Sequence, residues 1–247
     1  MTANGYHQAA HFHLLKSAVN PSLDEVIVDS HSIWAYVHML LFVYWLGADV
    51  GLYVSMAMVK NASLSFETRA TLTKLALYID IFPRVTFALI LPVGMHLVRD
   101  LGLYPIANAL LVFGWTIGVL WSALHLALLK YRGTDIGNVL ASINKIYELL
   151  MGLFFIIVGS TSVATGAPVA TQWFAVKLVL FGLIFWVILG FDTVFRPFSA
   201  IMRMGPSGST PGKETAVKRI TRLTMAWSLL LYLLIAAVAF LGKIKPF

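Results

Sequence analysis

Long apolar runs separated by short polar connections dominate the chain. A helix needs about 20 mainly apolar residues to cross a bilayer, and six runs meet this length: residues 33–59, 75–98, 106–129, 139–163, 173–194 and 223–242. The remaining connections are too short to form a soluble domain. The pattern therefore predicts an all-α fold, a polytopic membrane helix bundle with six transmembrane helices over residues 31–247. The second run contains Pro83 and Pro92, which membrane helices tolerate, and residues 71–78 form a candidate amphipathic lead-in to it.

Residues 1–30 precede the first run and form a predicted N-terminal tail at the outer surface or the membrane interface. The tail lacks the charged start, apolar stretch and cleavage site of a signal peptide. His7 and His11 are spaced i,i+4, so a helix would place both on one metal ion, with His13 and His31 as further ligands. A solvated interfacial segment without a metal is the alternative.

Composition narrows the class of protein further. Hydrophobic residues make up 59% of the 247 residues and charged residues only 12%, about half the charged fraction of an average soluble domain. This excludes a disordered chain and argues against a soluble enzyme. The chain has no cysteine, so any metal must be held by His, Lys, carboxylate or Met side chains.

The basic residues indicate an orientation in the membrane. The net charge is +7, but Lys and Arg lie in short connections and not along one solvated face, so nucleic acid is not an expected partner. With the amino terminus outside, the inner connections hold eleven Lys and Arg residues and the outer segments four. Because basic residues are retained on the cytoplasmic side, we expect both termini on the outer, periplasmic side of a bacterial inner (cytoplasmic) membrane.

Ionisable side chains inside the predicted spans form two layers, and such residues mark sites or buried pairs because they are costly in lipid. The outer layer consists of His38, His96 and Lys177, which we expect at one depth. The inner layer holds both signs of charge: Asp49, Asp80, Arg84, His125, Lys145, Glu148, Asp192 and Arg196.

The inner layer is interpreted first as a set of local helix pairs. Lys145 with Glu148 at i,i+3 and Asp192 with Arg196 at i,i+4 need no ligand. Asp49 has no such neighbour: it either relays protons from a site at His38, eleven residues earlier, or pairs with Arg84. His125 is expected to be a packing residue.

The outer layer offers ligands for an iron porphyrin. A neutral imidazole is the commonest protein ligand of haem iron, and His38 supplies one among aromatic residues. Of these, Trp45 is a candidate to line a flat macrocycle, although membrane aromatics are more often belt or packing residues. Lys177 is a metal ligand or base, or else a side chain that snorkels to the interface. His96 is a second candidate ligand, or an interfacial histidine without one.

Three stretches together resemble a known family. In residues 34–47, His38 is followed seven residues later by Trp45 and then by a small residue; Trp173 stands four residues before Lys177; and the chain ends in Lys-Pro-Phe. These features resemble HemJ-type protoporphyrinogen oxidases, whose wider relatives are CopD-like integral membrane proteins. Proteins of that family are shorter than this chain and usually have four spans, so the third and fourth runs of this chain look like an added hairpin.

The resemblance implies a particular chemistry. It implies a b-type haem bound through His38, with Lys177 important for ligation or catalysis. In the family, protoporphyrinogen IX is oxidised and electrons pass to quinone, and Lys177 or Asp49 would then accept protons. The expected partners are the lipid bilayer, a porphyrin or quinone, a partner redox subunit and, left open, a second copy of the chain.

Besides a structural partner with no cofactor, three functional hypotheses follow from these residues. The first is a membrane haem protein with redox function, an oxidoreductase if it is an enzyme. The second is a haem-bearing membrane anchor subunit of a dehydrogenase, which would bind a partner subunit. The third is a transporter or ion-path subunit that uses the intramembrane residues Asp49, Asp80, Arg84 and Glu148, with structural histidines.

Overall fold

The computed structural model describes residues 29–203 and 210–246, and within 196–203 the backbone only. The described chain is all-α. Its helices are α2 (Ser30–Val59), α3 (Phe66–Ile79), α4 (Ile81–Asp100), α5 (Asn108–Lys130), α6 (Asp135–Thr165), α7 (Gln172–Arg203) and α8 (Pro211–Ile244). Six segments are long and apolar enough to cross a membrane, with α3 and α4 together forming one of them. The predicted six-span membrane bundle is confirmed, and the chain is a multi-pass membrane protein.

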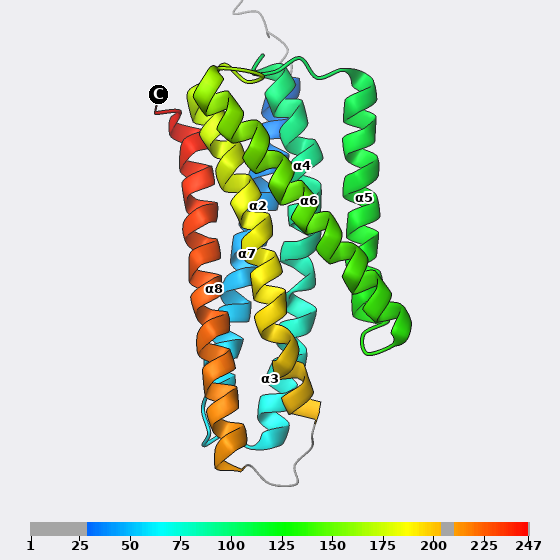
Figure 1. The fold of residues 1–247 in the computed structure, drawn as a ribbon, viewed down its shortest axis with the longest axis vertical. Helices are drawn as coiled ribbons and strands as arrows, with labels where there is room; N and C mark the ends of the chain where they lie inside the picture. The colour runs from blue at the N-terminus through cyan, green and yellow to red at the C-terminus, as the bar shows by residue number, and fades with distance from the viewer. Residues whose placement is uncertain (1–28, 204–209, 247) are drawn as a thin grey trace, which may run out of the picture.

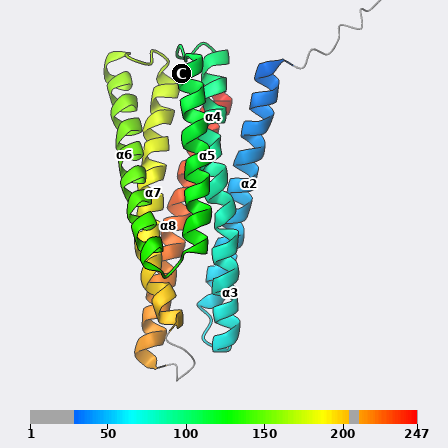
Figure 2. The same ribbon diagram turned by 90° about the vertical axis from the view of Figure 1, so that its right-hand side faces the viewer.

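The helices stand side by side along one long axis (Figures 1 and 2). We call the end where α2 and α7 begin the upper end, as drawn in Figure 1, and the opposite end, where α3 and α8 begin, the lower end. The described chain starts and finishes at the upper end. Which side of the membrane each end faces stays a prediction from the basic residues.

The second span is interrupted at Asp80, between α3 and α4. Pro83 has no backbone N–H, so it cannot donate to the carbonyl of Ile79 four residues earlier, and α3 ends at that residue. Asp80 keeps right-handed helical angles of φ −58° and ψ −17°. The chain therefore continues upward with a carboxylate at the junction. The predicted lead-in is a helix, which begins at Phe66 because Ser65 caps it by accepting a hydrogen bond from the Thr68 N–H at 3.2 Å.

The sixth span begins earlier than the apolar pattern predicts. Helix α8 starts at Pro211 and not at residue 223. Thr210 caps it by accepting a hydrogen bond from the Lys213 N–H, and proline at the first helical position suits the start of a helix. Residues 204–209, which connect α7 to α8, lie outside the described residues. The predicted tail, with His7, His11 and His13, also lies outside them except for its last two residues.

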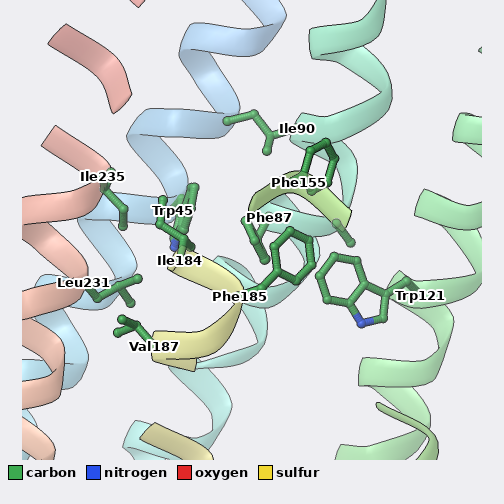
Figure 3. Close-up of a cluster of buried hydrophobic side chains, with 11 residues drawn as sticks. Trp45, Phe87, Ile90, Trp121, Phe155, Ile184, Phe185, Val187, Leu231 and Ile235 are labelled. Carbon is green, nitrogen blue, oxygen red and sulfur yellow. The ribbon is translucent and has the colours of Figure 1, made fainter. Parts of the chain in front are cut away.

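An aromatic core fills the middle of the bundle (Figure 3). Phe87 of α4 lies at its centre, with ring centroids 4.8 Å from Trp45 of α2 and 4.7 Å from Phe185 of α7. Trp121 of α5 stacks on Phe185 at 5.5 Å. Side chains of six helices thus meet in one layer, which we call the aromatic core: Trp45, Phe87, Ala88, Ile90, Trp121, Phe155, Ile184, Phe185, Val187, Leu231 and Ile235.

Helices α6 and α7 approach each other backbone to backbone. A Cβ atom at Gly159 would lie 2.8 Å from the Ala175 carbonyl oxygen, and one at Gly182 would lie 2.7 Å from the Gly152 carbonyl oxygen. Small residues allow such close contact between membrane helices. This contact fixes the position of α6, which contributes to the site below.

Candidate functional site

A small charged cavity lies directly below the aromatic core. Its volume is about 30 Å³, which is room for one or two water molecules. Every span contributes to its wall. The lining residues are Asp49, Leu52, Asp80, Pro83, Arg84, Phe87, Trp121, His125, Glu148, Ile188, Phe191, Ser228 and Leu231. We call this space the charged cavity.

Helical register places the charged cavity one turn below the core. Trp45 and Asp49 are four residues apart on α2, and Trp121 and His125 are four apart on α5. Residues at this spacing lie on one face of a helix, one above the other. Each helix thus gives an aromatic side chain to the core and a polar one to the layer below.

Arg84 holds together two carboxylates of the charged cavity. Its Nε donates to Asp80 Oδ2 at 2.7 Å, within the same span. Its two terminal nitrogens donate to the two carboxylate oxygens of Asp192 on α7, at 3.0 and 2.5 Å. Such a two-pronged pair fixes both distance and orientation. Arg84 therefore joins the second span to α7 beside the cavity.

A chain of hydrogen bonds joins α5 to α6 on the opposite wall. The Trp121 Nε1–H donates to Asn144 Oδ1 at 2.8 Å, and the Asn144 amide donates to Glu148 Oε1 at 2.9 Å. Asn144 and Glu148 are 3% and 1% exposed. The second carboxylate oxygen, Oε2 of Glu148, is buried and has no hydrogen-bond partner among the described residues.

Asp49 and His125 complete the polar lining. Asp49 is 4% exposed, and its Oδ2 atom has no hydrogen-bond partner in the described part of the chain. The same holds for Nδ1 of His125, which is 3% exposed. Tyr232 of α8 donates its hydroxyl to the backbone carbonyl of Asp49 and so ties α2 to α8. Three residues that line the cavity, Asp49, His125 and Glu148, therefore each have a buried polar atom without a hydrogen-bond partner among the described residues.

Carboxyl groups outnumber guanidinium groups among the described side chains that line the cavity. Asp49, Asp80 and Glu148 line it together with Arg84, which pairs with Asp80 and with the neighbouring Asp192. Within the described residues, Asp49 and Glu148 form no ion pair. An ionised carboxylate without a partner costs several kcal/mol in a low-dielectric interior. The arrangement thus suits two carboxyl groups that bind protons or a cation.

Comparison with protein-family models, curated proteins and solved structures finds no match to this chain. Its function therefore has to be argued from its own residues.

His38 and Lys177 lie near the upper end, on the far side of the aromatic core from the charged cavity. Lys177 is close enough to His38 to act on it electrostatically. Gly242 makes room for Lys177, because a Cβ there would lie 2.7 Å from Lys177 Nζ; a Cβ at Gly94 would be in ordinary contact with His38 Cε1, at 3.5 Å. Nδ1 of His38 is buried without a partner among the described residues. We call these two residues the upper pair.

His96 takes part in a separate aromatic group at the upper end. Its Nε2 accepts a hydrogen bond from the Trp115 Nε1–H at 3.0 Å, and its ring stacks on Trp34 at 3.8 Å. The Nε2 lone pair is thus already used. Of the three residues expected at one depth, His38 and Lys177 lie within electrostatic range of each other, whereas His96 contacts Trp115 and Trp34.

The residues of the upper end fit a haem only in part. The orphaned Nδ1 of His38 suits an axial ligand. Trp45, in contrast, is 4% exposed and packs on Phe87 in the aromatic core, so it does not line a space beside His38. Within the described residues, no group of three or more His, Asp or Glu side chains is arranged to hold a metal ion.

The partners of the inner-layer residues differ from the local pairs predicted by spacing. Glu148 bonds to Asn144, and no ion pair joins it to Lys145. Asp192 pairs with Arg84; the side chain of its predicted partner Arg196 lies outside the described residues. The sequence interpretation missed Asn144 and the cavity position of His125. The i,i+4 spacing of Asn144 and Glu148 in an apolar helix was the available signal.

Proposed function

We propose that this multi-pass membrane protein moves protons through the charged cavity, with Asp49 and Glu148 as the groups that accept and release them. One observation carries the proposal: two buried carboxyl groups face one water-sized cavity, and each keeps an oxygen without a partner. Intramembrane carboxylates of this kind typically belong to proton or ion pathways.

The neighbouring charges give each carboxyl group a distinct role. Asp80 and Asp192 are fixed by Arg84, so they hold the guanidinium in place. Asp49 and Glu148 lie on different helices and share the cavity without such a partner. Between them, the cavity has room for one or two water molecules, which would pass a proton on together with Nδ1 of His125, an atom without a partner among the described residues.

Proton flux into liposomes tests the proposal. The purified protein is reconstituted into vesicles loaded with potassium and a pH-sensitive dye, and valinomycin sets a potential that draws protons inward. We expect Asp49→Asn and Glu148→Gln each to lower the flux by about tenfold or more, since an amide cannot exchange the proton. Asp135→Asn, an exposed carboxylate at the start of α6, is the matched control and keeps the wild-type rate.

Two results would contradict the proton assignment. The assignment is wrong if the proton flux equals that of protein-free vesicles, or if Asp49→Asn and Glu148→Gln both keep the wild-type flux. A sodium-sensitive dye in parallel vesicles distinguishes protons from sodium ions. A sodium flux that depends on Asp49 and Glu148 would identify a metal cation, and not the proton, as the transported ion.

A second candidate function rests on the upper pair. His38 has a buried imidazole nitrogen without a partner among the described residues, and Lys177 lies within electrostatic range of its ring. This favours a b-type haem with His38 as its axial ligand, in a redox protein that acts on a porphyrin or quinone or serves as the membrane anchor of a redox partner. Bound haem would supply electron transfer, while His38 would hold it and Lys177 would lie beside it.

Absorption spectra test this second candidate. Purified protein is expected to show a Soret band that sharpens on reduction with dithionite. His38→Ala and Lys177→Ala should lose or shift the band, whereas Lys145→Ala, a half-buried lysine on α6, keeps it. Protein without the band, or a band unchanged in both variants, contradicts the haem assignment and leaves the proton path untouched.

A further inference from the structure

Two buried threonines on α8 below the charged cavity have unused hydroxyl groups. Thr221 and Thr224 are each 1% exposed, and neither Oγ1 atom has a hydrogen-bond partner among the described residues. Hydroxyls in apolar helices usually donate to the carbonyl four residues earlier. Thr86, Thr116, Ser122, Thr161, Thr193 and Ser228 all do so here. Thr221 and Thr224 are therefore exceptions, because their hydroxyl oxygens are buried without a partner in the described part of the chain.

These threonines continue the wall of the charged cavity downward. The buried face of α8 carries Val217, Thr221, Thr224 and Ser228 in sequence, and Ser228 lines the cavity. Above Ser228 the same face is apolar, with Leu231 and Ile235 in the aromatic core. The polar part of this face thus runs from the cavity toward the lower end only.

Helix α3 presents a matching face. Its buried residues are Arg69, Thr73 and Ala76, and the same spacing leads on to Asp80 at the cavity. Ala76 packs in one apolar cluster with Val217 of α8. The faces of α3 and α8 thus both contribute to one buried apolar cluster, shared with α2 and α7, between the cavity and the lower end; we call this region the seam.

An ion pair closes the seam at its lower end. Arg69 donates from its two terminal nitrogens to the carboxylate oxygens of Glu214 on α8, at 2.7 and 3.2 Å. Its Nε donates to the backbone carbonyl of Val59 at 2.9 Å. One guanidinium thus ties the ends of α2, α3 and α8 together. From Glu214 to Ser228 the helix rises about 21 Å, at 1.5 Å per residue.

We infer that Thr221 and Thr224 line a water route from the charged cavity to the lower end, and that the Arg69–Glu214 ion pair closes this route. The identity of the proton as the transported species rests on the proposed function, whereas the route itself rests on the unused hydroxyls and the ion pair. Opening requires the pair to separate, which frees α3 to move from α8.

Cysteine labelling tests the route directly, because the chain has no native cysteine. Thr224→Cys is compared with Ile235→Cys, a buried position on the same face of α8 but above the cavity. A charged, membrane-impermeant methanethiosulfonate is added to vesicles of each orientation, and the mass shift is followed in time. We expect Thr224→Cys to react at least about tenfold faster than Ile235→Cys, which corresponds to a difference of about 1.4 kcal/mol in activation free energy. The reaction should occur only with reagent added at the lower end.

A second variant tests the closure. Adding Glu214→Gln to Thr224→Cys should raise the labelling rate by about fivefold, the factor that corresponds to about 1 kcal/mol. The double substitution Arg69→Glu and Glu214→Arg exchanges the two charges and should return the labelling rate to that of Thr224→Cys alone. Intrinsic tryptophan fluorescence during heating checks that each variant is folded.

Each outcome decides one part of the inference. Equal labelling of Thr224→Cys and Ile235→Cys, with and without Glu214→Gln, overturns the route. Fast labelling that Glu214→Gln leaves unchanged overturns the closure by the ion pair. Labelling does not depend on proton flux, so a labelled, closable route in a protein that moves no protons contradicts only the proposed function.

Discussion

Arg84 is the residue on which the charge balance of the cavity depends. It forms ion pairs with Asp80 and Asp192, so its removal takes from both carboxylates the salt bridge that the described residues give them. We expect Arg84→Ala to lower the free energy of unfolding by about 3–5 kcal/mol. Thermal unfolding in detergent micelles, followed by tryptophan fluorescence, measures the loss.

Two further variants serve as controls for the stability loss expected of Arg84→Ala. Arg84→Lys keeps the charge but loses the two-pronged contact with Asp192, so an intermediate loss is expected. Arg99→Ala removes a salt bridge near the upper end and should change stability by no more than about 1 kcal/mol. A melting temperature of Arg84→Ala equal to that of wild type would contradict the role of the guanidinium.

Single residues show what the sequence could and could not predict about the site. Asp49, Arg84 and Glu148 stand out in the sequence because charge inside an apolar helix is costly. Their partners do not, because spacing identifies neighbours on one helix, and Asp192 reaches Arg84 from another span. Asn144 carries no charge, so a search for charged residues in apolar helices does not detect it, although it donates a hydrogen bond to Glu148.

At the scale of elements, the contact between α6 and α7 depends on glycine. A Cβ at Gly159 would lie 2.7 Å from the Val179 backbone nitrogen, closer than packed atoms approach. We expect Gly159→Ala to destabilise the protein by about 1–3 kcal/mol through overpacking, measured by thermal unfolding.

Gly47 provides a matched control for Gly159. It lies in the middle of α2, and a Cβ there meets nothing within 4 Å. Because alanine favours a helix over glycine by about 1 kcal/mol, Gly47→Ala should be neutral or stabilising. The packing argument fails if both alanine variants shift the melting temperature in the same direction.

The positions of the helices are predictable, whereas their ends depend on local chemistry. Long apolar runs identify all six spans because lipid requires each backbone polar group to bond within its own helix. The start of α8 at Pro211 is hidden by a polar stretch with Lys213 and Glu214, which hydropathy treats as a loop. The cap at Thr210 and the bond from Arg69 to Glu214 hold that stretch in helical form.

The surface of the whole molecule is that of a protein surrounded by lipid. Large apolar side chains are exposed on helix faces that point away from the bundle, such as Leu233 of α8 at 70% and Val112 of α5 at 66%. No soluble domain is present in the described residues, so the cavity and the upper pair both lie within the bundle. The basic residues predict that the lower end is cytoplasmic, and labelling from vesicles of known orientation reports on this as well.

The aromatic core determines where a membrane voltage acts on this protein. Voltage falls mainly across the dry, weakly polarisable part of a membrane protein and little across a water-filled part. Trp45, Phe87 and Phe185 form that insulating layer above the charged cavity. Moving one elementary charge through the full field takes about 2.3 kcal/mol per 100 mV. If protons follow the proposed path, the part of this work done at the aromatic core would fall on their passage beside Trp45, and a cell's membrane potential would act on the rate of that step.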